Sequence, residues 1–210
     1  MLRYTALGLL IANRQGPWVL DEPTHYDAYI GLDVLNGMAA FTFFSDGGQR
    51  CFVRLERSQQ KEKLLRSQVR AAVTAGVRDL LRTENASLRS IVLRRDGRLF
   101  ACEWSGFCDA LDDLKREDAL QTGIVTGAVE IHKNHASGLR MVAVEKDLVS
   151  NPLIGSWFAI NEHEGLICTT GEPFGLRGTV DPLYVGVVRG TLNLEWILQD
   201  TFAMSQLCWP

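Results

Sequence analysis

The chain has 210 residues, of which 46% are hydrophobic and 22% charged, which is typical of one large or two small soluble globular domains. Its formal net charge of −3 excludes a uniformly basic protein that coats nucleic acid, so any such contact needs a local patch. Five cysteines without CxxC spacing indicate reduced thiols and no zinc knuckle, and no run reaches the ~20 apolar residues that span a bilayer. We therefore expect a cytoplasmic protein that makes no membrane contact.

The first third of the chain predicts an N-terminal extension followed by three strands. Residues 1–27 are expected to form a short helix, which ends at Gly16-Pro17, and a loop that leads into the domain. The first two strands are separated by Asn36-Gly37, a tight-turn signal. The predicted strands are Ala28–Leu35, Met38–Ser45 and Arg50–Glu56. Together they indicate a three-stranded antiparallel meander.

Helices and strands alternate in the rest of the chain. Apolar residues recur at three- and four-residue steps from Ser58 to Arg82, which predicts a long amphipathic helix. A second helix is expected from Ser105 to Leu120, and a third from Leu192 to about Leu207. The expected strands are Ser90–Arg94, Ile124–His132, Leu139–Val144, Trp157–Ile160, Leu166–Thr169 and Leu183–Val188. This order predicts one α/β domain, residues 28–210, with a mixed sheet and flanking helices.

Two aspartates lie at predicted strands and are candidate metal ligands. Asp33 interrupts the apolar segment AYIGLDVL, where aspartate is uncommon and a buried carboxylate needs a partner. It is either a carboxylate that binds a divalent cation or a cap of the turn after the strand. Asp96 follows a second apolar strand in an Asp-Gly pair, which is also a common turn. Two-metal hydrolysis of a phosphodiester usually needs three or four such ligands.

The segment HKNHASGLR carries candidate contacts to phosphate. Lys133 and Arg140 lie in this loop together with two histidines and a glycine. Cations in a loop between strands suit contact with a nucleic-acid backbone, but the same composition is also that of an ordinary solvated loop. The sequence alone leaves both alternatives open.

In their order, several segments together resemble the PIWI domain of Argonaute proteins. The resemblance runs from about Gly16 to the last residue, and it rests on GPWVL, YIGLDV, VRDLL, VLRRDG, VEIHKNHASGLR, NPLIGS, CTTG and GTVDPLYVGVV. It implies an RNase H-like fold. It also implies partners: a guide strand and a target strand, a MID domain or a separate Argonaute half, and an effector protein.

Active members of this family cleave the target with two metal ions, Mg²⁺ or Mn²⁺, held by an Asp-Glu-Asp-Asp/His tetrad. Asp33 matches the first ligand and Asp96 the third. Counting back from VRDLL places the glutamate near Gln68, whereas Glu62, the nearest acid, requires a shift of nearly two helical turns. The fourth ligand falls beyond the final helix, where the chain stops at LCWP. A neutral Gln68 predicts poor metal binding, so no cofactor is expected.

The resemblance also assigns contacts with nucleic acid and an overall function. Lys133 and Arg140 are expected near the guide backbone, where Asp181 would repel phosphate and Arg177 or Arg189 would compensate. We expect guide-dependent binding of nucleic acid without target cleavage, in prokaryotic defence. Two alternatives remain: an active guided endonuclease of which this chain is a part, and an RNase H-like interaction scaffold that binds no nucleic acid.

Overall fold

A computed structural model of the chain describes residues 19–58, 62–82, 87–133, 138–146, 148–170 and 180–207. The helix expected near the N-terminus lies outside these ranges. The larger sheet has eight strands in the spatial order β3-β2-β1-β4-β5-β10-β9-β8. Their bounds are β1 Ala28–Leu35, β2 Met38–Ser45, β3 Arg50–Arg57, β4 Ser90–Asp96, β5 Val125–His132, β8 Trp157–Ala159, β9 Glu164–Ile167 and β10 Leu183–Arg189. A separate hairpin pairs β6 (Ala143–Glu145) with β7 (Leu148–Ser150).

The larger sheet is mixed, as predicted. The strands β1, β4 and β5 run parallel to one another, and every other neighbouring pair is antiparallel. The strands β1, β2 and β3 form the expected meander. The turn between β1 and β2 has a positive φ at Asn36 (51°) and at Gly37 (78°), which is the requirement of a type I′ turn. The parallel strands place their carboxyl ends along one edge of the sheet.

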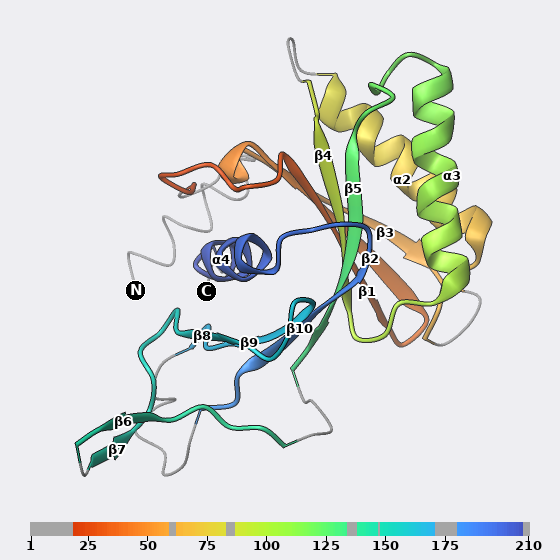
Figure 1. The fold of residues 1–210 in the computed structure, drawn as a ribbon. Helices are drawn as coiled ribbons and strands as arrows, with labels where there is room; N and C mark the ends of the chain where they lie inside the picture. Colours follow the sequence, from red (N-terminus) through yellow and green to blue (C-terminus); the bar gives the residue numbers. More distant parts are fainter. Residues whose placement is uncertain are drawn as a thin grey trace, which may run out of the picture.

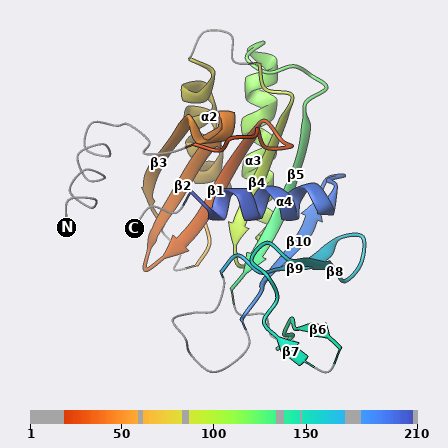
Figure 2. The ribbon, with the colours of Figure 1, turned by 90° about the vertical axis from the view of Figure 1, so that its left-hand side faces the viewer.

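Helices cover both faces of the sheet. The helices α2 (Arg66–Leu81) and α3 (Ala101–Arg116) pack side by side on one face, and α4 (Leu194–Ser205) lies across the other (Figure 1). The view in Figure 2 shows α4 in front of the strands, with α2 and α3 behind them. Each face has its own apolar core: Phe41, Phe43 and Phe107 belong to one, and Tyr29, Val129 and Leu198 to the other.

The first two helices begin at residues other than those predicted. The expected helix from Ser58 begins only at Arg66, because Leu65 is extended and its amide donates to the side chain of Gln68. The second begins at Ala101 rather than Ser105, since the carboxylate of Glu103 accepts the amide of Phe100. Apolar periodicity identified both helices, but the capping contacts that set their starts are not visible in that pattern.

One predicted strand is largely wrong. The segment Leu139–Val144 forms no strand before Ala143, and β6 then pairs only with β7 outside the larger sheet. Its apolar residues suggested burial, yet Leu139, Val142 and Val144 are all exposed. In the described ranges, no helix is both long and apolar enough to cross a membrane.

Candidate nucleic-acid interface

Asp33 and Asp96 lie together at the carboxyl ends of neighbouring parallel strands. The pairing of β1 with β4 runs from Ala28–Ile91 to Leu32–Arg95, and the two aspartates follow the last of these pairs. Asp33 is exposed and Asp96 half-buried, so neither carboxylate bears the cost of full burial. The structure therefore brings the two candidate metal ligands to the ends of neighbouring strands.

Lys133 joins the two aspartates from the end of β5. Its Nζ lies 2.7 Å from Oδ2 of Asp96. This hydrogen bond and the charge of Asp96 raise the pKa of Lys133, and Asp33 adds a smaller contribution. The site is therefore a cluster of two carboxylates and one ammonium group.

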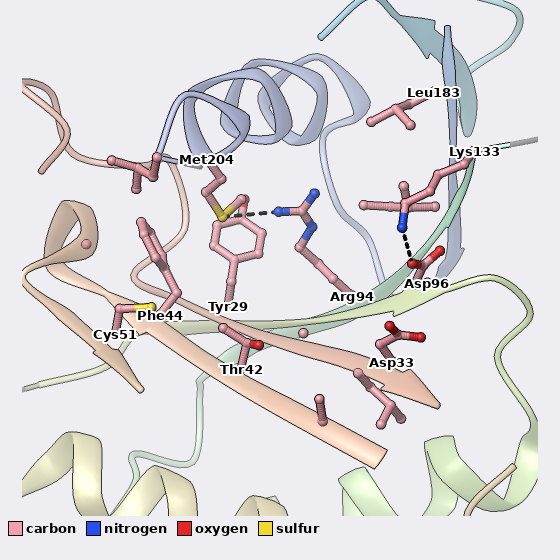
Figure 3. A pocket seen from close by; sticks show the side chains of 16 residues that line it. Tyr29, Asp33, Thr42, Phe44, Cys51, Arg94, Asp96, Lys133, Leu183 and Met204 are labelled. Atoms are coloured by element: carbon pink, nitrogen blue, oxygen red, sulfur yellow. Dashed lines mark hydrogen bonds and ion pairs between the residues drawn. The ribbon is translucent and has the colours of Figure 1, made fainter. Parts of the chain in front are cut away.

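This cluster forms one end of a cavity of about 560 Å³ on the face of the sheet that α4 covers. Figure 3 shows the cavity between the strands and the helix, with Asp33, Asp96 and Lys133 at one end and Phe44 and Cys51 at the other. Its wall is mainly apolar. The lining residues are Tyr29, Gly31, Leu32, Asp33, Ala40, Thr42, Phe44, Gly48, Cys51, Arg94, Asp96, Ile131, Lys133, Leu183, Met204 and Leu207.

Arg94 projects from β4 into the middle of this cavity (Figure 3). Because side chains two residues apart share a face of a strand, Arg94 and Asp96 point to the same side. Nη1 of Arg94 donates to Sδ of Met204 at 3.1 Å, and Nη2 donates to Oγ1 of Thr201 at 3.4 Å. Burial lowers the pKa of the Arg94 guanidinium, although Tyr29 and Asp200 act in the opposite direction.

A buried polar network supports Arg94 from behind. The guanidinium lies 5.7 Å from the centre of the Tyr29 ring, whose hydroxyl donates to the carboxylate of Asp200. Burial, followed by the charge of Asp200, raises the pKa of Tyr29. Asp200 is 2% exposed and also accepts the backbone amide and Nδ1 of His25. This network was not predicted from the sequence, although the period-two spacing of Arg94 and Asp96 indicates that both side chains lie on one face of the strand.

The two candidates for the second tetrad position lie in different places. Gln68 does not line the cavity; its amide group donates to the carbonyl of Arg57, and its oxygen accepts the amide of Leu65. Glu62 lies in the segment before α2, and its carbonyl accepts a hydrogen bond from Nη2 of Arg95 at 2.8 Å. Gln68 therefore caps a helix, whereas the backbone of Glu62 is bound to the strand that ends at Asp96.

Of the remaining predicted phosphate contacts, the structure describes Arg140 and Arg189. Arg140 forms an ion pair with Asp181, and both side chains are about half exposed. The predicted repulsion of phosphate by Asp181 is thus offset by Arg140 within the protein. Arg177 lies outside the described residues. Arg189 is exposed at the end of β10, and its Nη1 donates to the carbonyl of Val188.

The donor set at Asp33 and Asp96 does not fit a pair of catalytic metal ions. Across the part of the chain that the structure describes, His, Cys, Asp and Glu side chains nowhere form a group of three or more suited to a metal ion. Two carboxylates, one of them paired with Lys133, leave two dications poorly neutralised. We therefore derive no metal-dependent step from this site.

Comparisons with known proteins concern the fold. No family model and no curated protein sequence matches the chain. Among solved structures, the Argonaute of Clostridium butyricum bound to a guide DNA and a 19-mer target DNA is similar, with a TM-score of 0.71 and 21% sequence identity. The similarity covers 97% of this chain and 26% of the Argonaute, so the chain spans about a quarter of that protein's length. This confirms the predicted α/β fold as Argonaute-like, of the RNase H-like type.

Proposed function

We infer that this chain is the PIWI-type lobe of an Argonaute-like protein, and that it binds a guide–target duplex without cutting the target. The observation that carries this proposal is the pairing of Asp96 with Lys133 at the carboxyl ends of β1, β4 and β5. An ammonium group lies beside the aspartates that the resemblance assigns to the metal ions. The similar Argonaute is bound to guide and target DNA, which supports nucleic acid as the ligand class.

The cations that would contact the duplex are accessible. The side chain of Lys133 is 71% exposed and that of Arg140 is 50% exposed, so each has an outer side on which a phosphate can bind. Exposed ion pairs contribute little to stability, so exchange of a carboxylate for a phosphate costs little. Binding through such contacts weakens steeply with salt, because counterions are released from the nucleic acid. Recognition of foreign nucleic acid would follow from base pairing of the guide, with any killing done by a partner protein.

A binding assay with charge reversals tests this proposal. Fluorescence anisotropy of a labelled guide–target DNA duplex is measured with the wild-type chain and with the Lys133→Glu/Arg140→Glu double variant. The control is Arg82→Glu/Arg89→Glu, because these arginines also form exposed ion pairs with aspartates but are not among the predicted phosphate contacts. We expect affinity to fall at least tenfold in the first variant and much less in the second. Equal losses in both variants, or no binding by the wild type at low salt, would contradict the proposal.

An active guided nuclease is a second candidate function, favoured by the position of Glu62. The hydrogen bond from Arg95 holds the backbone of Glu62 beside β4, so this acid is the better candidate for the second ligand than the helix-capping Gln68. Incubation with guide, target and Mn²⁺ decides between the two functions. Target cleavage that is lost in Asp33→Ala and in Glu62→Gln would establish the nuclease and overturn the proposal of binding alone.

A further inference from the structure

Two cations line the cavity, and they differ in how they are neutralised. Lys133 is paired with Asp96, whereas no carboxylate among the described residues lies within ion-pair distance of Arg94. A guanidinium has five N–H donors in a planar fork that suits carboxylates and phosphates. In this structure the fork reaches only a thioether sulfur, which is a weak acceptor, and a hydroxyl at 3.4 Å. Most of its capacity to bind an anion is therefore unused.

The surroundings hold this guanidinium in place and exclude water from one side. Tyr29 lies beneath it, and the hydrogen bond of the Tyr29 hydroxyl to Asp200 holds the ring in place. The hydrogen bonds of the Asp200 carboxylate are directed at His25, Tyr26 and Tyr29 rather than at Arg94. An anion bound to a fixed, partly desolvated cation interacts more strongly than one bound to a mobile surface side chain.

We propose that Arg94 binds a backbone phosphodiester of the nucleic-acid strand that runs past Asp96 and Lys133. Arg94 and Asp96 lie two residues apart on one face of β4, about 6.6 Å along the strand, and Nζ of Lys133 lies 2.7 Å from Oδ2 of Asp96. A nucleic-acid strand with one phosphate at Lys133 therefore passes Arg94, and we expect a neighbouring phosphate to bind there. The apolar wall formed by Phe44, Leu183 and Met204 faces the sugar and base of that nucleotide. This inference rests on the proposed function and adds a named contact to it.

The test pairs a variant with a chemically altered strand. Each strand of the duplex is synthesised with a neutral methylphosphonate at one position at a time, and its affinity for the whole chain is measured. With the wild type, we expect one position at which the substitution weakens binding about tenfold because of the lost Arg94 contact. With Arg94→Gln, that same position becomes insensitive, all other positions keep their effect, and the slope of log K against log salt falls by about one.

Control variants separate this contact from a structural role. Arg94→Lys keeps the positive charge. We expect this variant to have the salt slope of the wild type but an affinity between those of Arg94→Gln and the wild type. Arg89→Gln removes an exposed arginine just before β4 and should leave the pattern of sensitive positions unchanged. Melting temperatures of all variants are measured in parallel to detect any loss of folded protein. A uniform loss of folded protein would lower all affinities but would not change which phosphate positions are sensitive.

The outcomes distinguish the inference from the function on which it rests. If the wild type binds the duplex and Arg94→Gln keeps the same sensitive positions and the same salt slope, Arg94 has no phosphate contact and the inference is wrong. If free inorganic phosphate competes at Arg94 as well as the strand does, the site is one for a free anion and the inference is also overturned. If the wild type binds no duplex, the proposed function fails and the inference fails with it.

Discussion

The ammonium group of Lys133 lies 2.7 Å from a carboxylate oxygen of Asp96, at the place where the ends of three parallel strands meet. A lysine in this position acts as a counter-ion for the acidic pair. It also competes with any divalent cation for the same oxygens. If a phosphate draws Lys133 away, we expect Asp33 and Asp96 to bind a cation more readily.

Removal of this lysine should make the acidic pair a better cation site. We expect Lys133→Gln to bind Mn²⁺ roughly tenfold more tightly than the wild type, because a competing positive charge is lost. Titration followed by electron paramagnetic resonance measures the free ion directly. Lys115→Gln is the matched control, since Lys115 lies on α3 and does not line the cavity. An affinity for Mn²⁺ that is equal in both variants would show that Lys133 does not occupy the cation position.

Asp200 is expected to be the most sensitive position of the network behind Arg94. In Asp200→Asn one oxygen is replaced by a donor, so Nδ1 of His25, which contacts Oδ1, and the hydroxyl of Tyr29, which contacts Oδ2, cannot both keep an oxygen acceptor. We expect a loss of about 2 kcal/mol in the free energy of unfolding, measured by urea denaturation. Glu195→Gln, at an exposed position of the same helix, should stay within about 0.5 kcal/mol of the wild type. Similar free energies of unfolding for the two variants would show that the hydrogen bonds of Asp200 do not stabilise the fold.

Period-two and helical patterns were enough to predict most of the fold. The strands β1 and β2 begin and end at the predicted residues, because Asn36-Gly37 and Asp46-Gly47 mark their ends without ambiguity. The start of α2 could not be predicted in this way. It depends on Leu64, which is buried although Lys63 before it is exposed, and whose amide donates to Glu103, 39 positions further along the chain.

The candidate site was predictable only in part. Asp33, Asp96 and Lys133 were each identified from the sequence, and the parallel pairing of the strands brings them together. Their mutual contact depends on the register between strands, which the sequence does not state. Arg94 was overlooked because its role depends on α4, a helix about 110 residues away that forms the other wall of the cavity.

Loss of one partner of the buried ion pair between Arg95 and Glu103 should destabilise the protein more than replacement of both partners by apolar residues. Glu103 is 0% exposed, and Arg95 also donates to the carbonyls of Glu62 and Asp96. We expect Glu103→Gln to lower the free energy of unfolding by about 3 kcal/mol, because it leaves Arg95 buried without a counter-charge. The double variant Arg95→Met/Glu103→Leu should recover part of this loss, as measured by denaturant titration. Additive losses in the double variant would contradict the coupling.

Acid should weaken the contact between α2 and α3. Hydrogen bonds from Arg66 and Arg70 lower the pKa values of Asp109 and Asp113, respectively. A depressed pKa in the folded state means that the stabilisation is present above the unfolded value of about 3.9 and is lost as the pH falls through the lower folded value. We expect the melting temperature of the wild type to exceed that of Asp109→Asn/Asp113→Asn at pH 7, and the difference to close below about pH 3.9.

Salt provides the control for this last expectation, because the ion pairs are exposed on the arginine side. The side chains of Arg66 and Arg70 are 61% and 50% exposed, so about 1 M NaCl should screen them and reduce the difference between wild type and variant at pH 7. The same difference at pH 7 and pH 3, at either salt concentration, would show that the aspartates stabilise the helix pair through packing and not through charge. A difference that disappears with acid and shrinks with salt assigns their effect to the two arginines of α2.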